Sequence, residues 1–352
     1  MHGCYNDFVM WEQPVSLLCY LVVAALVVFL SIKLSDFVDL LDKKTNISGA
    51  FLGGILLAAV TSLPELFTSI TATILIGNNN YVLGNILGSD LFNITLFAIV
   101  YIVFFGKLVT AKVSKYHLLS LLFIGLLYAT VTVAGFVFEF NGLTWGWFNP
   151  LSILIVVIYA IAVLKTPKTE EAEDKETDSK LTVKQIIVLF ILFSLMLIGA
   201  SIGITYLTDW VVNSFNMGDT LGGALFLGIA TSLPEMTATI TLCHKKNFNA
   251  AYGNILGSCV FNFIILAFAD ALSFRSSTHL YLFDQSSFLL LVFGAVSILT
   301  FLVSFLLTLK GLKNNMIYRI SFIVISVILL ASYIAYVVLS AIPLNLPFLP
   351  GA

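Results

Sequence analysis

Two short segments of the sequence place a proline and a glutamate side by side within a long apolar run. "TSLPELFTSI" begins at Thr61, and "TSLPEMTATI" begins at Thr231. A proline inside a helix leaves the carbonyl four residues earlier without its usual donor, and the glutamate supplies a carboxylate at the same level. Carbonyls, hydroxyls and carboxylates are the oxygen ligands that hard cations such as calcium prefer. Each segment therefore has the composition of half a cation site.

A second repeated segment adds polar groups at a matched distance along the chain. "GNILGSDLFN" at 84–93 recurs as "GNILGSCVFN" at 253–262, an offset of 169, against 170 for the proline–glutamate segments. In each copy a serine and an asparagine lie four residues apart and share one helix face; the pairs are Ser89 with Asn93 and Ser258 with Asn262. Two blocks in the same order and at matched spacing indicate an internal duplication.

The spacing also predicts that the two blocks of each half meet. About 13 residues, or ~20 Å of helix at ~1.5 Å per residue, lead from Glu65 to a turn near Asn78, and a similar length leads back to Ser89. The polar face at Ser89 thus returns to the depth of Glu65, and the same arithmetic applies to Glu235 and Ser258. The converged set contains carboxylates, amides and hydroxyls, and it requires no histidine or cysteine.

The composition identifies the kind of element that carries these blocks. Of the 352 residues, 59% are hydrophobic and 10% are charged, which leaves too little polar surface for a soluble domain of this size. Apolar runs of about 20 residues recur along the chain and predict an all-α membrane protein. We predict ten transmembrane helices, at roughly 15–40, 47–76, 81–106, 115–137, 146–165, 183–208, 217–243, 250–273, 282–309 and 317–342.

The duplication divides these spans into two inverted five-helix repeats. The first repeat is 1–165, a polar cytoplasmic linker is 166–182, and the second repeat is 183–352. Because each half has an odd number of spans, the second half enters the membrane from the opposite side, which is typical of secondary transporters. Irregular backbone at membrane depth is tolerated where it lines a cavity or is buried in protein.

Charge predicts the orientation of the chain. With the amino terminus outside, 16 of the 17 lysines and arginines fall in inside loops, and only Arg275 falls outside. Both termini are therefore expected to be extracytoplasmic. The net charge of −2 favours no nucleic acid as a partner. The four cysteines show no paired spacing, and we expect His117, His244 and His279 to be solvated loop residues.

Not every residue of the repeated blocks is expected to bind an ion. The glycines of "GNILG" form a small-xxx-small pattern, which favours close helix packing. A glutamate inside a membrane helix indicates function by default, because a charge there is costly. Two glutamates at equivalent positions make Glu65 and Glu235 the strongest candidates.

These blocks resemble the two alpha-repeats of the cation/calcium exchanger superfamily, and "TSLPE" resembles its sodium/calcium exchanger branch rather than its proton/calcium branch. The resemblance covers the whole chain in layout: ten spans, two inverted halves and a central cytoplasmic loop. It implies a calcium antiporter of a bacterial or archaeal plasma membrane. The central loop is too short for the regulatory calcium-binding domains of animal exchangers.

The resemblance also implies a set of metal-ligating residues. Glu65 and Glu235 match the paired acidic ligands of the calcium site, and carbonyls at Thr61 and Thr231 match its other protein ligands. The flanking sodium sites and the pair bordering the central site match Ser62, Ser232, Ser89, Ser258, Asn93 and Asn262, with carbonyls near Ala58 and Gly228. Some microbial relatives carry an aspartate where this chain has Asn262, and Asp90 departs from the repeat because its counterpart is Cys259.

The sequence therefore predicts a secondary active antiporter that exchanges calcium for sodium by alternating access at a midplane site. Its expected partners are calcium ions, sodium ions and membrane lipid, and no cofactor is expected. Two alternatives stay open: proton-coupled exchange of calcium or another divalent cation on the same scaffold, and, with less support, a cation channel. No nucleophile–base pair stands out, so an enzyme is not predicted.

Overall fold

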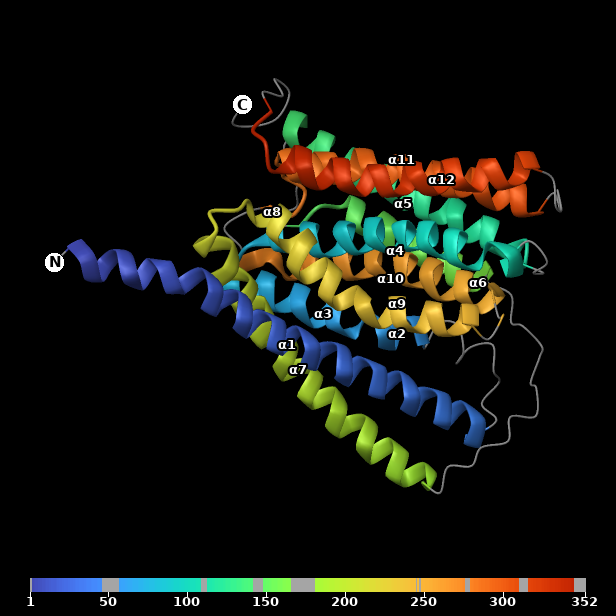
Figure 1. Cartoon of the computed structure of the whole chain (residues 1–352), viewed down its shortest axis with the longest axis horizontal. Helices are drawn as coiled ribbons and strands as arrows, with labels where there is room; N and C mark the ends of the chain where they lie inside the picture. Colours follow the sequence, from blue (N-terminus) through green and yellow to red (C-terminus); the bar gives the residue numbers. More distant parts are fainter. Residues whose placement is uncertain are drawn as a thin grey trace.

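The structure, a computed structural model, describes residues 2–45, 57–108, 113–141, 148–165, 181–244, 246, 248–275, 279–309 and 316–344. These residues form helices joined by short connections (Figure 1). In chain order the elements are α1 (His2–Thr45), α2 (Leu57–Thr61), α3 (Leu63–Ile70), η2 (Thr71–Ile76), α4 (Asn79–Leu108), α5 (Tyr116–Asn141), α6 (Leu151–Lys165), α7 (Val183–Ser214), α8 (Asp219–Gly222), η3 (Gly223–Gly228), α9 (Ile229–His244), α10 (Phe248–Leu272), η4 (Ser273–Arg275), α11 (Gln285–Leu309) and α12 (Met316–Ser340). The elements η2 and η3 are π-helical, and η4 is a single 3-10 turn.

Most of these helices are long and apolar enough to cross a membrane. Among the described residues, eight helical segments meet that condition, and Leu63–Ile76 and Leu151–Lys165 are shorter apolar helices. The first part of the predicted second span, 47–76, lies outside the described residues. Most of the predicted linker, 166–182, also lies outside them. The protein is an all-α integral membrane protein, and the count of ten spans stays a prediction.

The outer helices expose apolar side chains, whereas the inner helices bury theirs. On α1, Leu18 and Val22 are 63% and 64% exposed, and on α7, Leu195 is 62% exposed. Lipid tails are as apolar as a leucine side chain, so such surfaces suit a bilayer rather than water. By contrast, α4 and α10, which carry the two "GNILGS" segments, bury most of their residues.

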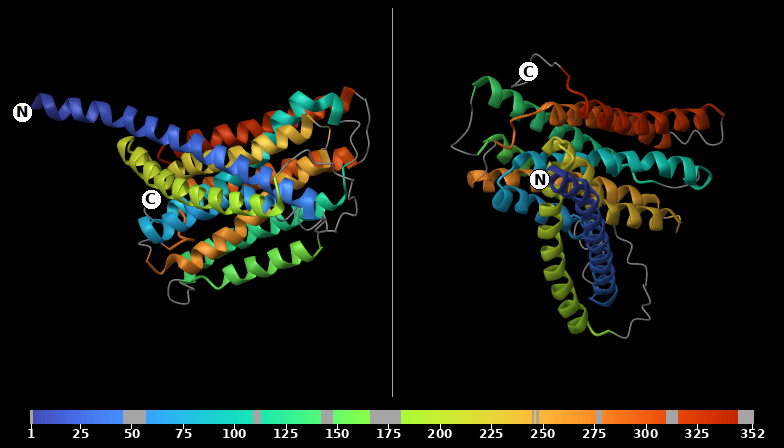
Figure 2. Two further views of the ribbon diagram at one scale, coloured as in Figure 1. Left: turned by 90° about the horizontal axis from the view of Figure 1, so that it is seen from below. Right: turned by 60° about the vertical axis from the view of Figure 1, so that its left-hand side comes forward.

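The helices α4 and α10 lie at the centre of the bundle. Helix α4 contacts α9, α10, α11 and α12, while α10 contacts α3, α5, α6 and α9. Figure 1 shows α5, α11 and α12 on one side of this centre, and α1 and α7 side by side on the other. In the right-hand view of Figure 2, the α1–α7 pair projects away from the other helices. The repeated blocks are thus carried by inner helices.

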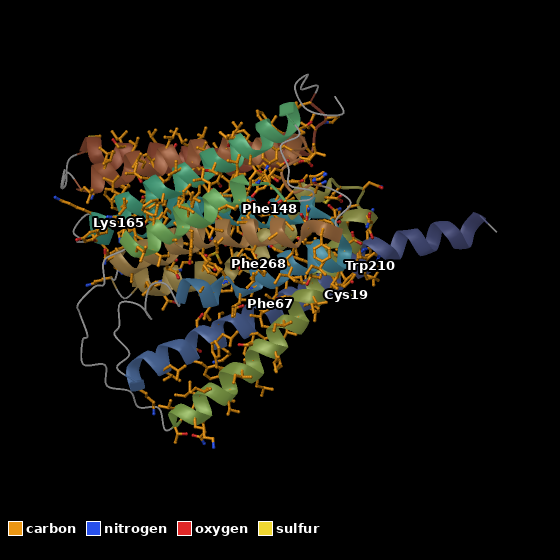
Figure 3. The ribbon with its side chains drawn as sticks, turned by 180° about the vertical axis from the view of Figure 1, so that it is seen from behind. Cys19, Phe67, Phe148, Lys165, Trp210 and Phe268 are labelled. Carbon is orange, nitrogen blue, oxygen red and sulfur yellow. The ribbon has the colours of Figure 1, made fainter. Side chains whose placement is uncertain are left out.

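The two ends of the bundle can be followed from labelled residues. Figure 3 shows Lys165, at the end of α6, and Trp210, near the end of α7, at opposite ends of the molecule. The predicted orientation puts Lys165 on the inside and the end of α7 on the outside. The two residues therefore mark the two faces that this prediction assigns.

Glycines bring α4 close to the segment formed by α8 and η3. A Cβ atom at Gly84 would lie 2.1 Å from the carbonyl oxygen of Thr220, and one at Gly88 would lie 2.7 Å from the Cα atom of Ala224. Neither distance is possible for a real side chain, so the prediction that the glycines serve packing is confirmed for the first copy, whereas a Cβ at Gly253 of the second copy would lie 3.6 Å from the His117 ring, an ordinary contact. The close approach lets side chains of α4 reach carbonyls of η3.

The structure corrects the expectation for one histidine. His117 is part-buried rather than solvated: its Nε2 lies 2.9 Å from Asn249 Oδ1, and its ring stacks on Tyr252. Because Asn249 Oδ1 also accepts the backbone N–H of Ser114, His117 fixes the start of α5 against α10.

Candidate cation site

The first proline–glutamate segment interrupts its helix, as the sequence predicts. Helix α2 ends at Thr61, Ser62 has φ −90° and ψ 11°, and α3 begins at the next residue. Pro64 stands in the first turn of α3, where a missing N–H breaks no bond within that helix. The Leu66 N–H donates to the Ser62 carbonyl at 3.1 Å, so the chain resumes its helix at once. Glu65 therefore lies beside the break, near a helix N-terminus that favours a carboxylate.

The second segment has a proline at the equivalent position but does not interrupt its helix. Helix α9 continues through Pro234. The π-helical element η3 (Gly223–Gly228) directly precedes α9. Around the end of η3, the Thr231 hydroxyl donates to the Leu227 carbonyl at 2.8 Å, and the Ser89 hydroxyl donates to the Gly228 carbonyl at 3.1 Å.

Each glutamate accepts a hydrogen bond from a serine of the other half. Ser62 Oγ donates to Glu235 Oε1 at 3.3 Å, and Ser232 Oγ donates to Glu65 Oε1 at 3.5 Å. Ser258 Oγ also donates to Glu235 Oε1, at 3.1 Å, and lies 2.7 Å from Ser62 Oγ. All five side chains are fully buried. The two proline–glutamate segments thus meet, and each supplies a hydroxyl to the opposite carboxylate.

The second oxygen of each glutamate has no hydrogen-bond donor. Oε2 of Glu65 and Oε2 of Glu235 are buried and unpartnered, although Thr231 and Thr61 lie against the two carboxylates. An unsatisfied buried acceptor costs about 1–3 kcal/mol, and more when it is charged. The like charges of the two carboxylates also repel each other. A cation shared by both would remove both penalties.

The donor set around this point is made of oxygens. No cluster of three or more His, Cys, Asp or Glu side chains that could hold a metal lies within the described part of the chain. A cation at the glutamate pair would therefore be held by two carboxylates together with neutral hydroxyl and carbonyl oxygens. Such a mixed set suits a hard cation with flexible coordination, such as calcium.

Two amides that the sequence analysis missed hold the backbone of the glutamates. Asn85 Nδ2 lies 3.3 Å from the Glu65 carbonyl oxygen, and Asn254 Nδ2 lies 3.3 Å from the Glu235 carbonyl oxygen. Each amide also donates to a hydroxyl of its own half, that of Thr68 at 2.9 Å and that of Thr239 at 3.0 Å. The signal was present: both are the second residue of "GNILGS", one helical turn before the predicted serine.

The asparagines predicted to border the site lie on α4 and α10. Asn93 is fully buried, and neither polar atom of its amide has a partner. Asn262 Nδ2 donates to Asp90 Oδ1 at 2.8 Å, while Asn262 Oδ1 is unpartnered. Asp90 therefore contacts α10, whereas its neighbour Ser89 contacts η3. This divergence follows from the ~100° between successive residues around a helix.

The structure brings most of the predicted site residues together. The residues at the glutamate pair are Glu65, Glu235, Thr61, Thr231, Ser62, Ser232 and Ser258. Ser89 departs from its repeat counterpart, because it donates to the Gly228 carbonyl rather than to a glutamate. Ala58 lies in α2, one turn before the break, and its side chain is outside the description.

Comparison with known proteins identifies the family. The sequence model described as "Sodium/calcium exchanger protein" matches residues 15–165 and 185–342, which include both copies of both repeated blocks. The chain belongs to the sodium/calcium exchanger protein family. The family match stops on either side of the predicted linker, so the repeated halves are what this exchanger-family chain shares with its relatives.

Individual relatives of this exchanger-family protein are distant in sequence. An uncharacterized membrane protein of Methanocaldococcus jannaschii is 24% identical over 216 residues, which are 60% of this chain and 67% of that protein. A crystal structure of the H+/Ca2+ exchanger CAX has a TM-score of 0.65 at 16% identity and covers 92% of this chain and 90% of that one. A structure of the sodium-calcium exchanger NCX_Mj has a TM-score of 0.52 at 18% identity, with 89% and 97% covered. The fold is common to both kinds of exchanger.

Proposed function

We propose that the protein is a secondary active antiporter that exchanges calcium for sodium at the site formed by Glu65 and Glu235. The observation that carries this proposal is the meeting of two buried carboxylates, one from each half, each with an unpartnered oxygen. Two carboxylates balance the charge of one divalent cation, which offsets most of the penalty of burying them. Calcium takes about six to eight oxygens at ~2.3–2.6 Å, and the hydroxyls and carbonyls around the pair supply neutral ones.

The proposed scaffold is a set of ten spans in two inverted repeats, 1–165 and 183–352. The reciprocal bonds support a twofold relation, because Ser62 binds Glu235 while its counterpart Ser232 binds Glu65. In such a scaffold, each half can close one side of the site, which gives alternating access. We place the protein in a plasma membrane with both termini outside, on the strength of the lysine and arginine distribution.

Sodium is the proposed counter-ion because neutral oxygens flank the carboxylates. Ser62, Ser232 and Ser258 all donate to the glutamates, and their oxygens have lone pairs for a small cation. A proton needs only the carboxylates. Proton-coupled exchange is the second candidate, and the observation that favours it is the burial of two like-charged carboxylates, each able to take up a proton when calcium leaves.

Calcium flux into liposomes tests the proposal. Purified protein is reconstituted, and uptake of radioactive calcium is followed with sodium or potassium inside, with and without a pH gradient, at potentials set by potassium and valinomycin. We expect uptake that requires internal sodium. Uptake that ignores sodium and follows a pH gradient would assign the proton-coupled mechanism, and calcium flux without any ion on the opposite side would indicate a channel.

A further inference from the structure

Asn85 on α4 joins the two halves of the protein at one glutamate. Its Nδ2 lies 3.3 Å from the carbonyl oxygen of Glu65, in the first half, and its Oδ1 lies 3.3 Å from the hydroxyl of Thr231, in the second half. All three side chains are fully buried. The Thr231 hydroxyl also reaches the Leu227 carbonyl at 2.8 Å, so its one proton is shared between its own helix and the other half.

The repeat supplies a second amide at the equivalent place, Asn254 on α10. Its Nδ2 lies 3.3 Å from the Glu235 carbonyl oxygen, which repeats the contact of the first half. By the same repeat, Asn254 Oδ1 should accept a hydrogen bond from Thr61, the counterpart of Thr231. Instead, Asn254 Oδ1 is buried and has no hydrogen-bond partner among the described residues. The contact between the halves is thus made in one direction only.

Thr61 is well placed to make the missing bond. Its side chain lies against the carboxylate of Glu235, and Asn254 contacts the backbone carbonyl of the same glutamate. A buried acceptor without a donor is unfavourable, so the Asn254 oxygen is stabilised in any arrangement that turns the Thr61 hydroxyl toward it.

We propose that Asn85 and Asn254 are positioning residues that select the state of the exchanger. The bond from Thr231 to Asn85 holds the state of this structure, and a bond from Thr61 to Asn254 holds the state open to the opposite side. In an inverted repeat the two states exchange the conformations of the halves, so a contact made by one half in one state belongs to the other half in the second. This inference rests on the proposed function, because alternating access is what requires a second state.

A sequence difference between the halves is the rival explanation for the one-sided contact. Thr68 Oγ1 accepts from Asn85 Nδ2 at 2.9 Å, whereas the counterpart of Thr68 is Ala238, which has no hydroxyl. If this difference alone set the asymmetry, the Asn254 oxygen would stay without a donor in both states. Removal of the Thr61 hydroxyl would then leave the balance between the states unchanged.

The balance between the states can be read from the calcium affinity at the two faces of the membrane. The half-saturating calcium concentration at one face is the intrinsic dissociation constant divided by the fraction of protein open to that face. The ratio of the outer value to the inner value therefore follows the ratio of the two states. A variant that weakens the site equally in both states leaves this ratio unchanged, which separates positioning from a purely structural effect.

Exchange of radioactive calcium for unlabelled calcium gives both values without any choice of counter-ion, in right-side-out and in inverted membrane vesicles. Thr231→Val and Thr61→Val each remove one hydroxyl and keep the shape of the side chain and the backbone carbonyl. We expect the ratio to move about two- to tenfold, the effect of one hydrogen bond, in opposite directions in the two variants. In the double variant the ratio should return to the wild-type value.

Thr130→Val is the matched control. The Thr130 hydroxyl is buried and donates to the carbonyl four residues earlier, that of Leu126, at 2.9 Å, as the Thr231 hydroxyl does to Leu227. Thr130 lies on α5, away from the glutamate pair, so its variant should leave the ratio unchanged.

Each outcome decides the question. Shifts in the same direction, or an unchanged ratio in Thr61→Val, would overturn the role of the asparagine pair and leave calcium exchange intact. Wild-type vesicles that exchange no calcium would overturn the proposed antiporter itself. If a valine variant does not fold, Asn85→Leu and Asn254→Leu remove the other partner of each bond, and the absence of opposite shifts in them would overturn the inference in the same way.

Discussion

Replacing one glutamate of the pair by glutamine removes a charge and preserves the shape of the site. In the wild type, Ser62 Oγ and Ser258 Oγ lie 3.3 Å and 3.1 Å from Glu235 Oε1. In Glu235→Gln the amide oxygen can still accept both hydrogen bonds. The Asn254 contact to the backbone carbonyl at 3.3 Å is also kept. The change therefore tests the carboxylate as a cation ligand, and Glu65→Gln tests its partner in the same way.

The expected loss of calcium affinity is large. Removing one partner from a buried charge pair costs about 3–5 kcal/mol, which corresponds to an affinity loss of about 10²–10⁴-fold. At a calcium concentration ~100 times the wild-type Kd, binding adds about 2.7 kcal/mol to the free energy of unfolding. For a variant that binds ~100-fold more weakly, the same concentration adds only ~0.4 kcal/mol.

Thermal unfolding of the purified protein in detergent measures this difference. In a chelator, both glutamine variants should unfold at a higher temperature than the wild type, because they lose the repulsion between Glu65 and Glu235. On addition of calcium, the wild type should gain several degrees and the variants little. Asp36→Asn, at an exposed carboxylate 3.2 Å from Lys33 Nζ, serves as the control and should respond to calcium like the wild type. A glutamine variant that calcium stabilises as much as the wild type would refute the assignment of the site.

Three further predictions concern packing, the amides and the orientation. Gly84→Ala should abolish folding or transport, because its Cβ would lie 2.1 Å from a backbone oxygen, whereas Gly125→Ala, with open space around it, should be stabilised by roughly 0.5–1 kcal/mol. Asn254→Leu should lower stability by about 1–3 kcal/mol in a denaturation experiment, because a buried carbonyl and a hydroxyl lose their donor. In a background without native cysteines, a membrane-impermeant thiol reagent should label Asn216→Cys in intact cells and Lys246→Cys only after permeabilisation; both positions are exposed, and the reverse result would invert the topology.

The sequence predicted the membrane spans because their signal is local. A run of about 20 apolar residues needs no tertiary information, and the structure has long apolar helices where eight of these runs lie. A proline predicts a broken or bent helix without saying which, and the structure has a break at Ser62 in the first half and a continuous α9 in the second. A proline shows that a hydrogen bond must be missing, but the outcome depends on packing between distant parts of the chain, such as the contact of η3 with α4, which no local pattern contains.

The residues of the candidate site could be predicted from the sequence, but the hydrogen bonds between them could not. Duplication singled out Glu65 and Glu235, since residue type and position carried that signal. The crossed bonds from Ser62 and Ser232 depend on how the two halves dock, which no local pattern contains. Asn85 was missed because only Ser89, one helical turn further along α4, was matched in depth to Glu65.

The two halves carry nearly the same motif, yet the structure holds them in different states. In the first half the helix breaks at Ser62, and in the second half α9 is continuous through Pro234. Ser258 binds a glutamate, whereas its counterpart Ser89 binds the carbonyl of Gly228. Identical segments in identical surroundings would adopt one conformation, so this asymmetry belongs to the way the halves pack. An antiporter needs such a difference, because a site open to both sides at once would let ions leak down their gradients. A proline beside a glutamate meets this need, because the proline weakens the helix at the point where the charge lies. The backbone beside the two glutamates can then change its hydrogen bonds without unfolding the rest of the helix.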